Sequence, residues 1–259
     1  MGELYALLTA VMWAAAVIFL KRSGETMPPF ALNLFRIALS SAALVITVAA
    51  AGQDLLYPAP LADYLTLFAS GVIAIAVSDT FFLMALNRIG AGIMAIVDCL
   101  YAPSVVFFAF IMLGERLGPW QYAGMGLVIL GVVIASRHEP PPGATVRQIL
   151  AGVLWGVCSM ATVAFGIVLA KPVLGRSPIL WATTMRQIGA LIVMIPTALA
   201  MRGRREIFSV FLPRRGWRYS IPGTLIGSYL ALIFWIGGMK YSLAGSAAIL
   251  NQTSSVYIL

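Results

Sequence analysis

Residues 10–14 read AVMWA and residues 152–156 read GVLWG. Each stretch opens a run of hydrophobic segments, and the two runs follow the same order along the chain. Duplicated sets of membrane segments are typical of secondary transporters, which hold their substrate near the middle of the bilayer, where the two halves meet. The repeat therefore predicts a membrane protein built from two related halves.

The composition also indicates a membrane protein. Hydrophobic residues make up 61% of the chain and charged residues 10%, with a mean hydropathy of +0.96, whereas soluble domains are about 45–50% apolar and about 25% charged. A helix needs about 17–25 apolar residues to cross the hydrocarbon layer. On this criterion we expect spans at 4–20, 30–51, 64–86, 91–113, 119–136, 148–170, 178–200 and 219–238, and a ninth span that begins near Ala244 and is still running at Leu259.

The basic residues predict the orientation, because Lys and Arg gather in cytoplasmic loops. The odd-numbered connections hold eleven of them, six between 202 and 218, and the even-numbered connections hold four: Arg116, Lys171, Arg176 and Lys240. We therefore expect the odd connections in the cytoplasm and the N-terminus outside. The role of basic residues in orientation accounts for the net charge of +8, so no nucleic-acid partner is expected. The expected partners are the lipid bilayer and a small-molecule substrate. The protein is expected to be a monomer or a homodimer.

The proline run at 140–142 is the predicted boundary between two domains, since proline cannot continue a helix. The first domain, residues 1–139, holds five spans, and the second, residues 140–259, holds the others. An odd number of spans makes the second half enter the membrane in the opposite sense, so the repeat is inverted. The longest polar connections, 137–147 and 201–218, are too short to fold independently.

The correspondence between the halves extends along the chain. Pro29 precedes Arg36 in the second span, and Pro178 precedes Arg186 in the seventh. The segment AGIMAIVD at 91–98 is matched by AGSAAILN at 244–251.

These residues resemble those of the EamA-type permeases of the drug/metabolite transporter superfamily. The resemblance rests on Trp13 and Trp155, on the two proline–arginine pairs, on Pro103, and on the run GERLGPWQYAGMGLVILGVVI at 114–134. It implies an all-α polytopic fold of ten helices in two inverted five-helix repeats. On this pattern, the given sequence is expected to stop within the ninth helix. It also implies an inner-membrane secondary transporter that moves small metabolites by alternating access, often as export of amino acids or drugs.

The chain departs from this pattern in its second half. At the position that matches Pro103 it has Val256, and at the position that matches Asp98 it has Asn251. We therefore expect the two halves to behave differently.

Four ionisable residues lie inside the expected spans, where each costs several kcal/mol unless it is paired or hydrated. Arg36, Asp79 and Asp98 lie at a similar depth from the same side, so we expect Arg36 to form a network with Asp98, Asp79 or both. The network could be a structural charge lock, or it could be a substrate or proton site in which an acid exchanges partners.

The fourth residue, Arg186, lies at the depth of Asn251 and Gln252 on the other side. It could bind an anionic group of the substrate, or it could pair with Asn251, backbone carbonyls or water. Trp13, Trp155 and Tyr101, together with Tyr229 and Trp235, are candidates for stacking or cation–π contact with a substrate, against the alternative of simple packing.

The remaining chemistry indicates that the chain is not an enzyme. His138 is its only histidine and lies beside the proline run, no HExxH pattern occurs, and Cys99 and Cys158 both fall inside spans. We expect no metal, no cofactor and no catalytic residues. Glu115 is expected to favour the N-terminus of the helix that follows it. The alternative to a transporter is a non-transporting membrane scaffold or assembly factor of the same fold.

Overall fold

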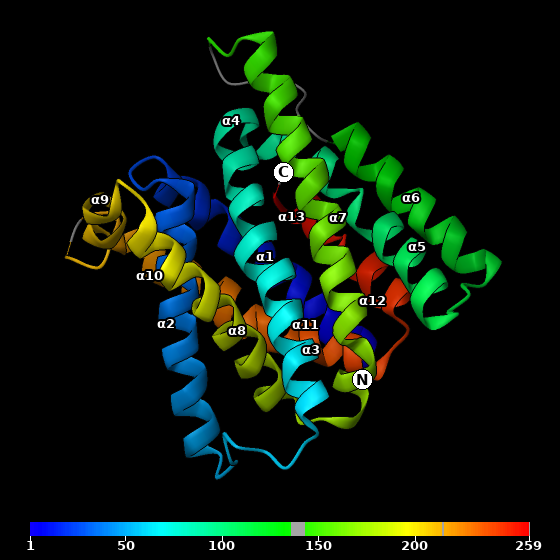
Figure 1. Ribbon diagram of the computed structural model, residues 1–259. Coiled ribbons are helices and arrows are strands. Elements are labelled where there is room, and N and C mark those ends of the chain that lie inside the picture. Colours follow the sequence, from blue (N-terminus) through cyan, green and yellow to red (C-terminus); the bar gives the residue numbers. More distant parts are fainter. Residues whose placement is uncertain (136–142, 214, 259) are drawn as a thin grey trace.

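The computed structural model describes residues 1–135, 143–213 and 215–258, and all regular structure in these residues is helical (Figure 1). The first half contains α1 (Gly2–Gly24), α2 (Pro29–Ala50), α3 (Leu61–Gly71), η1 (Val72–Val77), α4 (Ser78–Asp98), α5 (Tyr101–Leu113) and α6 (Pro119–Ala135). The second contains α7 (Val146–Arg176), α8 (Ile179–Ala200), α9 (Arg204–Ser209), α10 (Trp217–Gly223), η2 (Thr224–Ala231), α11 (Leu232–Tyr241), α12 (Ala244–Asn251) and α13 (Ser254–Ile258).

The helices confirm the predicted all-α polytopic membrane fold. In the described residues, 6 continuous helical segments are long and apolar enough to cross a membrane, and α5 and α6 are shorter apolar helices. Helix starts agree closely with the expected spans, including the one at Ala244. The proline run at 140–142 and His138 lie outside the described residues, so the domain boundary there stays a prediction.

The expected span at 91–113 is not one helix. Gly90 has φ 74°, which separates 91–98 from the helix before it, and the helix stops again at Cys99 and Leu100 before α5 begins. Pro103 explains the second break, because it has no N–H to donate to the carbonyl group four residues earlier, that of Cys99. The second half breaks at the matching place, between the end of α12 and the start of α13.

The third span of each half contains a π-helix. In the register that pairs 91–98 with 244–251, Val72–Val77 falls opposite 225–230, which lies inside η2. π-helices are rare and occur often at functional sites. Their matching positions extend the repeat from sequence to backbone geometry.

One expected connection is helical. The span predicted to end at 170 continues to Arg176 as α7, whose start is fixed by a capping box between Thr145 and Gln148. Lys171 lies inside this helix, and its ammonium donates to the backbone oxygen of Met239 at 2.9 Å and to that of Ser242. The α7 end is also held to α3, since the Arg176 Nε donates to Asp63 Oδ2 at 3.0 Å.

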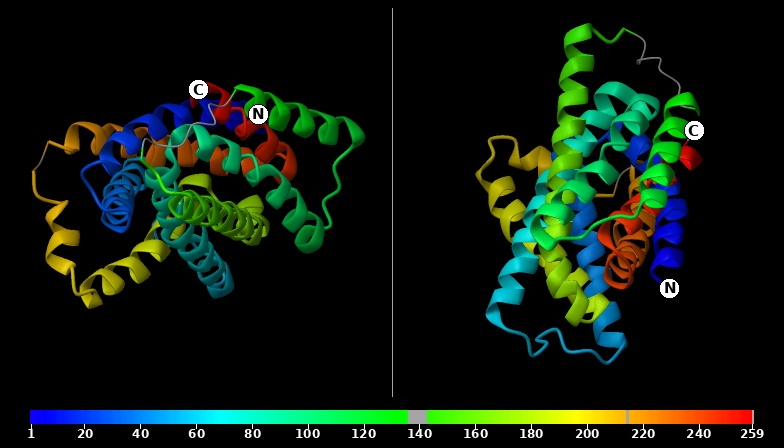
Figure 2. Two further views of the ribbon diagram at one scale, coloured as in Figure 1. Left: turned by 90° about the horizontal axis from the view of Figure 1, so that it is seen from above. Right: turned by 90° about the vertical axis from the view of Figure 1, so that its right-hand side faces the viewer.

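The two halves pack into one another. α4 lies along α7, α1 along α11 and η2, and α3 along α8, while α6 lies at the edge of the bundle (Figure 2). Glycines make the α3–α8 contact close: a Cβ on Gly71 would overlap the backbone oxygen of Arg186, and one on Gly189 would lie 2.5 Å from the Phe68 Cα. The space that remains in the middle is therefore bounded by helices of both halves.

Candidate functional site

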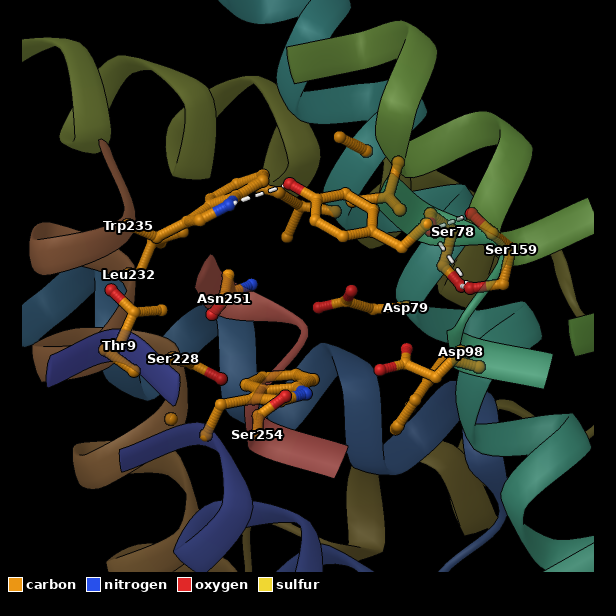
Figure 3. A pocket seen from close by; sticks show the side chains of 18 of the residues that line it. Thr9, Ser78, Asp79, Asp98, Ser159, Ser228, Leu232, Trp235, Asn251 and Ser254 are labelled. Atoms are coloured by element: carbon orange, nitrogen blue, oxygen red, sulfur yellow. Dashed lines mark hydrogen bonds between the residues drawn. The ribbon is translucent and has the colours of Figure 1, made fainter. Parts of the chain in front are cut away.

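A cavity of about 110 Å³ lies between the halves (Figure 3). Both breaks and both π-helices contribute to its wall. The lining residues of the first half are Thr9, Trp13, Arg36, Ile37, Ala74, Ile75, Ser78, Asp79, Phe82, Asp98 and Tyr101. Those of the second half are Ser159, Met160, Val163, Gln187, Gly227, Ser228, Ala231, Leu232, Trp235, Asn251, Gln252 and Ser254.

Arg36 connects three elements at the wall of this cavity. It lies two turns into α2, which starts after Pro28, and only 1% of the residue is exposed. Its Nη2 lies 3.4 Å from Asp79 Oδ2 in α4, and its Nε donates to Ser228 Oγ in η2 at 3.0 Å. The structure thus pairs Arg36 with Asp79, one of the two acids expected as its partner.

Asp98 does not pair with Arg36. It is the last residue of α4, and its Oδ2 accepts hydrogen bonds from Gln252 Nε2 and Ser255 Oγ, each at 3.3 Å. Among the described residues, no lysine or arginine forms an ion pair with it. Asp98 is therefore where the broken helix of the first half meets the broken helix of the second.

Aromatic side chains line the same cavity as these acids. Trp13 packs on Phe82, with ring centroids 5.7 Å apart, and the Trp235 Nε1 donates to the Tyr101 hydroxyl at 2.9 Å. In Figure 3, Asp79 and Asp98 point into the same space, which Asn251 faces from the opposite side. The cavity thus combines carboxylates, aromatic rings and an amide.

Two expected site residues lie away from the cavity wall. Arg186 is fully buried, and its Nε donates to Ser70 Oγ in α3 at 2.9 Å while its guanidinium lies 5.1 Å from the Trp235 ring centroid. The expected cluster with Asn251 and Gln252 is not formed, because Gln252 bonds to Asp98 instead. Trp155 packs on Phe81 at 4.8 Å between centroids and is not among the lining residues.

Sequence reasoning missed Gln187, which lines the cavity beside Arg36. Its Nε2 donates to Ser40 Oγ at 2.9 Å and to the Ser228 backbone oxygen at 3.1 Å. An amide inside an apolar span, next to Arg186, was the available signal.

A serine pair was missed as well. The hydroxyls of Ser78 and Ser159 donate to each other's backbone oxygens at 2.8 and 2.9 Å, which ties α4 to α7. Serine is common in membrane helices, where it is often a packing residue, so the sequence carried no comparable signal for this pair.

Glu115 caps a different helix from the one expected. Its Oε2 accepts from the backbone N–H of Ala244 at 2.8 Å, at the start of α12, and its Oε1 lies 3.4 Å from the Lys171 Nζ. These contacts run to the second half and not to α6, the helix that Glu115 was expected to favour. Glu115 therefore joins the two halves at one end of the molecule.

The polar groups of the site suit binding and exchange of partners. In the part of the chain that the structure describes, no group of at least 3 His, Cys, Asp or Glu side chains is placed to hold a metal ion. What the cavity offers instead is a pair of carboxylates, one shared with a guanidinium and one bonded only to neutral donors. Such groups can receive a charged ligand or a proton.

The comparisons with known proteins agree with this architecture. Residues 1–137 and 150–259 match the model of the EamA-like transporter family. A solved structure, titled only as the crystal structure of a protein, is similar over 99% of this chain and 85% of its own, with a TM-score of 0.74 and 18% identity; at this identity the likeness shows the fold alone. No curated protein matches the chain significantly. Because the family match covers nearly the whole sequence, the chain belongs to the EamA-like transporter family of the drug/metabolite transporter superfamily and is a multi-pass membrane protein.

Proposed function

We propose that this protein is a secondary transporter of the inner membrane that moves small metabolites by alternating access, with the substrate in the central cavity. The observation that carries the proposal is the position of that cavity: it is lined by both halves, between two broken helices, and contains buried charged side chains. Movement of residues 1–139 against 140–259 would then open it to either side. A multi-pass fold with a polar cavity near its centre is what such a cycle requires.

The charged residues have defined places in this proposal. Asp98 is the group that binds substrate or proton, because it has no counter-ion among the described residues and both of its hydrogen bonds end on Oδ2. Arg36 holds Asp79 and Ser228 together, and so links α2, α4 and η2 while the cavity changes shape. Trp13, Tyr101, Asn251 and Gln252 complete the wall against which a substrate would lie.

Reconstitution in liposomes tests the proposal. The full chain is purified, inserted into vesicles with an imposed pH gradient, and tested with a panel of radiolabelled amino acids, amines and other metabolites. We expect substrate-dependent flux that Asp98→Asn lowers by about tenfold or more, as expected for the loss of a hydrogen bond to a charged group. Asp54→Asn, in the exposed connection after α2, serves as the control and leaves the flux unchanged.

The same assay decides between the alternatives. Absence of flux for the whole panel, with alanine tolerated at Arg36, Asp79 and Asp98, would favour a non-transporting membrane scaffold of the same fold. If Asp98→Asn leaves the flux and its pH dependence unchanged while Arg36→Ala prevents folding, the charged network is a structural lock.

A further inference from the structure

The charges that line the cavity do not balance. Arg36 and Asp79 face each other at 3.4 Å and offset one another. Asp98 forms no ion pair with any described residue, and Arg186, which is stacked on Trp235, is not part of the lining. Arg186 interacts electrostatically with Asp79 from behind this surface, so the carboxylate that a ligand would meet without a paired counter-ion is that of Asp98.

Several hydrogen-bond acceptors at and beside Asp98 have no donor. Both hydrogen bonds to its carboxylate end on Oδ2, which leaves Oδ1 for a ligand. Two neighbouring amide oxygens, Gln252 Oε1 and Asn251 Oδ1, have no hydrogen-bond donor, although Gln252 is only 1% exposed. The amide of Gln252 is oriented by its own bond to Asp98, so its oxygen stays an acceptor.

Acceptors without a donor at Asp98, Asn251 and Gln252 favour a ligand that donates hydrogen bonds there. Among the fully buried side-chain atoms of the described lining, the donor without a partner is Arg36 Nη1, on a guanidinium that already serves Asp79 and Ser228. An ammonium group carries up to three donors and a positive charge, whereas a carboxylate ligand would bring further acceptors and repel Asp98.

The aromatic side chains suit the same ligand. Trp13, Tyr101 and Trp235 line the cavity together with Asp98. The face of an aromatic ring attracts a cation within about 6 Å and also packs against apolar groups. A ligand with a positively charged end and an apolar or aromatic body would therefore contact the carboxylate and the rings at once.

We propose that the central cavity binds a monovalent amine cation with an apolar or aromatic body, and that the ammonium group lies at Asp98. The inference rests on the proposed transport function and names its substrate class. A zwitterion or an anion of the same size would bring a carboxylate, and with it further acceptors, beside Asp98 and would bind less tightly there.

A set of matched probes tests the inference by isothermal titration calorimetry on the full chain in detergent. 2-Phenylethylamine, phenylalanine and 3-phenylpropionate share a phenyl group and differ in charge. We expect the amine to bind at least about tenfold more tightly than the other two, which corresponds to about 1.4 kcal/mol. Asp98→Asn should remove this preference, whereas Asp54→Asn should keep it.

Asp98→Asn is expected to fold, because the matching position of the second half already has Asn251 at a helix break. If it does not fold, the ranking of the three probes on the unchanged protein still decides. Tighter binding of phenylalanine or 3-phenylpropionate, or no binding of the amine, would overturn the inference.

Failure of this inference can be told from failure of the proposed function. Flux of another metabolite in liposomes, without amine binding, would leave transport standing and remove the substrate class. Amine binding without flux for any of the panel would keep the site and remove the transport.

Discussion

The pair of Arg36 and Asp79 shows how a charge is kept inside an apolar bundle. Removing an ion from water costs several kcal/mol, which attraction to one counter-ion repays only when other polar groups are also satisfied. Arg36 meets this condition in part: Ser228 and Asp79 serve its Nε and Nη2, whereas its Nη1 has no partner. Its place is therefore set by three helices at once, and losing it would leave a carboxylate behind.

Replacing Arg36 by alanine should destabilise the protein by about 3–5 kcal/mol, because Asp79 would then be largely buried without its counter-ion. Removing both charges, in the double variant Arg36→Leu and Asp79→Leu, should recover most of this loss. Thermal unfolding in detergent, followed by circular dichroism, measures both. Equal unfolding temperatures for the single and the double variant would contradict the argument.

The similar depth of Arg36, Asp79 and Asp98 in their expected spans was enough to predict that Arg36 pairs with an acid. It did not show which of the two acids is the partner. The depth of a residue ignores the direction of its side chain, and the break after Asp98 turns that carboxylate toward Gln252 instead. Arg186 was harder, because its partners are the Ser70 hydroxyl in α3 and the ring of Trp235 in α11, and the sequence does not fix how these helices are placed against α8. Contacts of this kind depend on packing between segments far apart in the chain.

Among the elements, the helix breaks and close helix crossings decide how the cavity is shaped. Pro103 and Gly90 carry a visible signal for the breaks of the first half. The break between α12 and α13 has no proline, since Val256 stands there, and it is accompanied by polar contacts of Gln252 and Ser255 with Asp98. Those contacts require the folded first half, so the sequence of the second half alone could not predict them.

The crossing of α3 and α8 should not tolerate a side chain on Gly71. Gly71→Ala places a Cβ against the backbone of Arg186, and backbone cannot yield as a side chain can, so we expect a loss of about 3 kcal/mol or more. Gly175→Ala in α7, where nothing lies within 4 Å of the added atom, is the matched control and should change stability by less than about 1 kcal/mol. Chemical denaturation in mixed micelles compares them, and a neutral Gly71→Ala would contradict the close crossing.

Glu115 should contribute more than its position in a short turn suggests. Glu115→Gln removes the charge shared with Lys171 and weakens the cap on α12, so we expect a loss of about 1.5–3 kcal/mol. Glu25→Gln is the control: its contact with Arg22 is 3.9 Å long and more than half exposed, and such pairs contribute about 0–1 kcal/mol. Similar unfolding temperatures for the two variants would show that the Glu115 contact does not hold the halves together.

For the molecule as a whole, the sequence predicted a polytopic fold of two inverted halves, and the charge of the connections predicts its orientation in the membrane. Labelling of single cysteines tests that orientation in a background where Cys99 and Cys158, both free thiols, are replaced by alanine. Gln53→Cys, after α2, should react with an impermeant maleimide in intact cells. Glu25→Cys, after α1, should react only after permeabilisation, and the reverse pattern would place the N-terminus inside.

The acid at the first helix break and the amide at the second give the two halves unequal electrical roles. With Asp98 ionised, the wall of the empty cavity carries one negative charge, and a bound monocation makes it neutral. A membrane potential acts on a moving charge with about 2.3 kcal/mol per 100 mV, so voltage would govern the return of the empty protein and not the passage of the loaded one. Exchange of one amine for another never passes through the empty form, and its rate would therefore be independent of voltage.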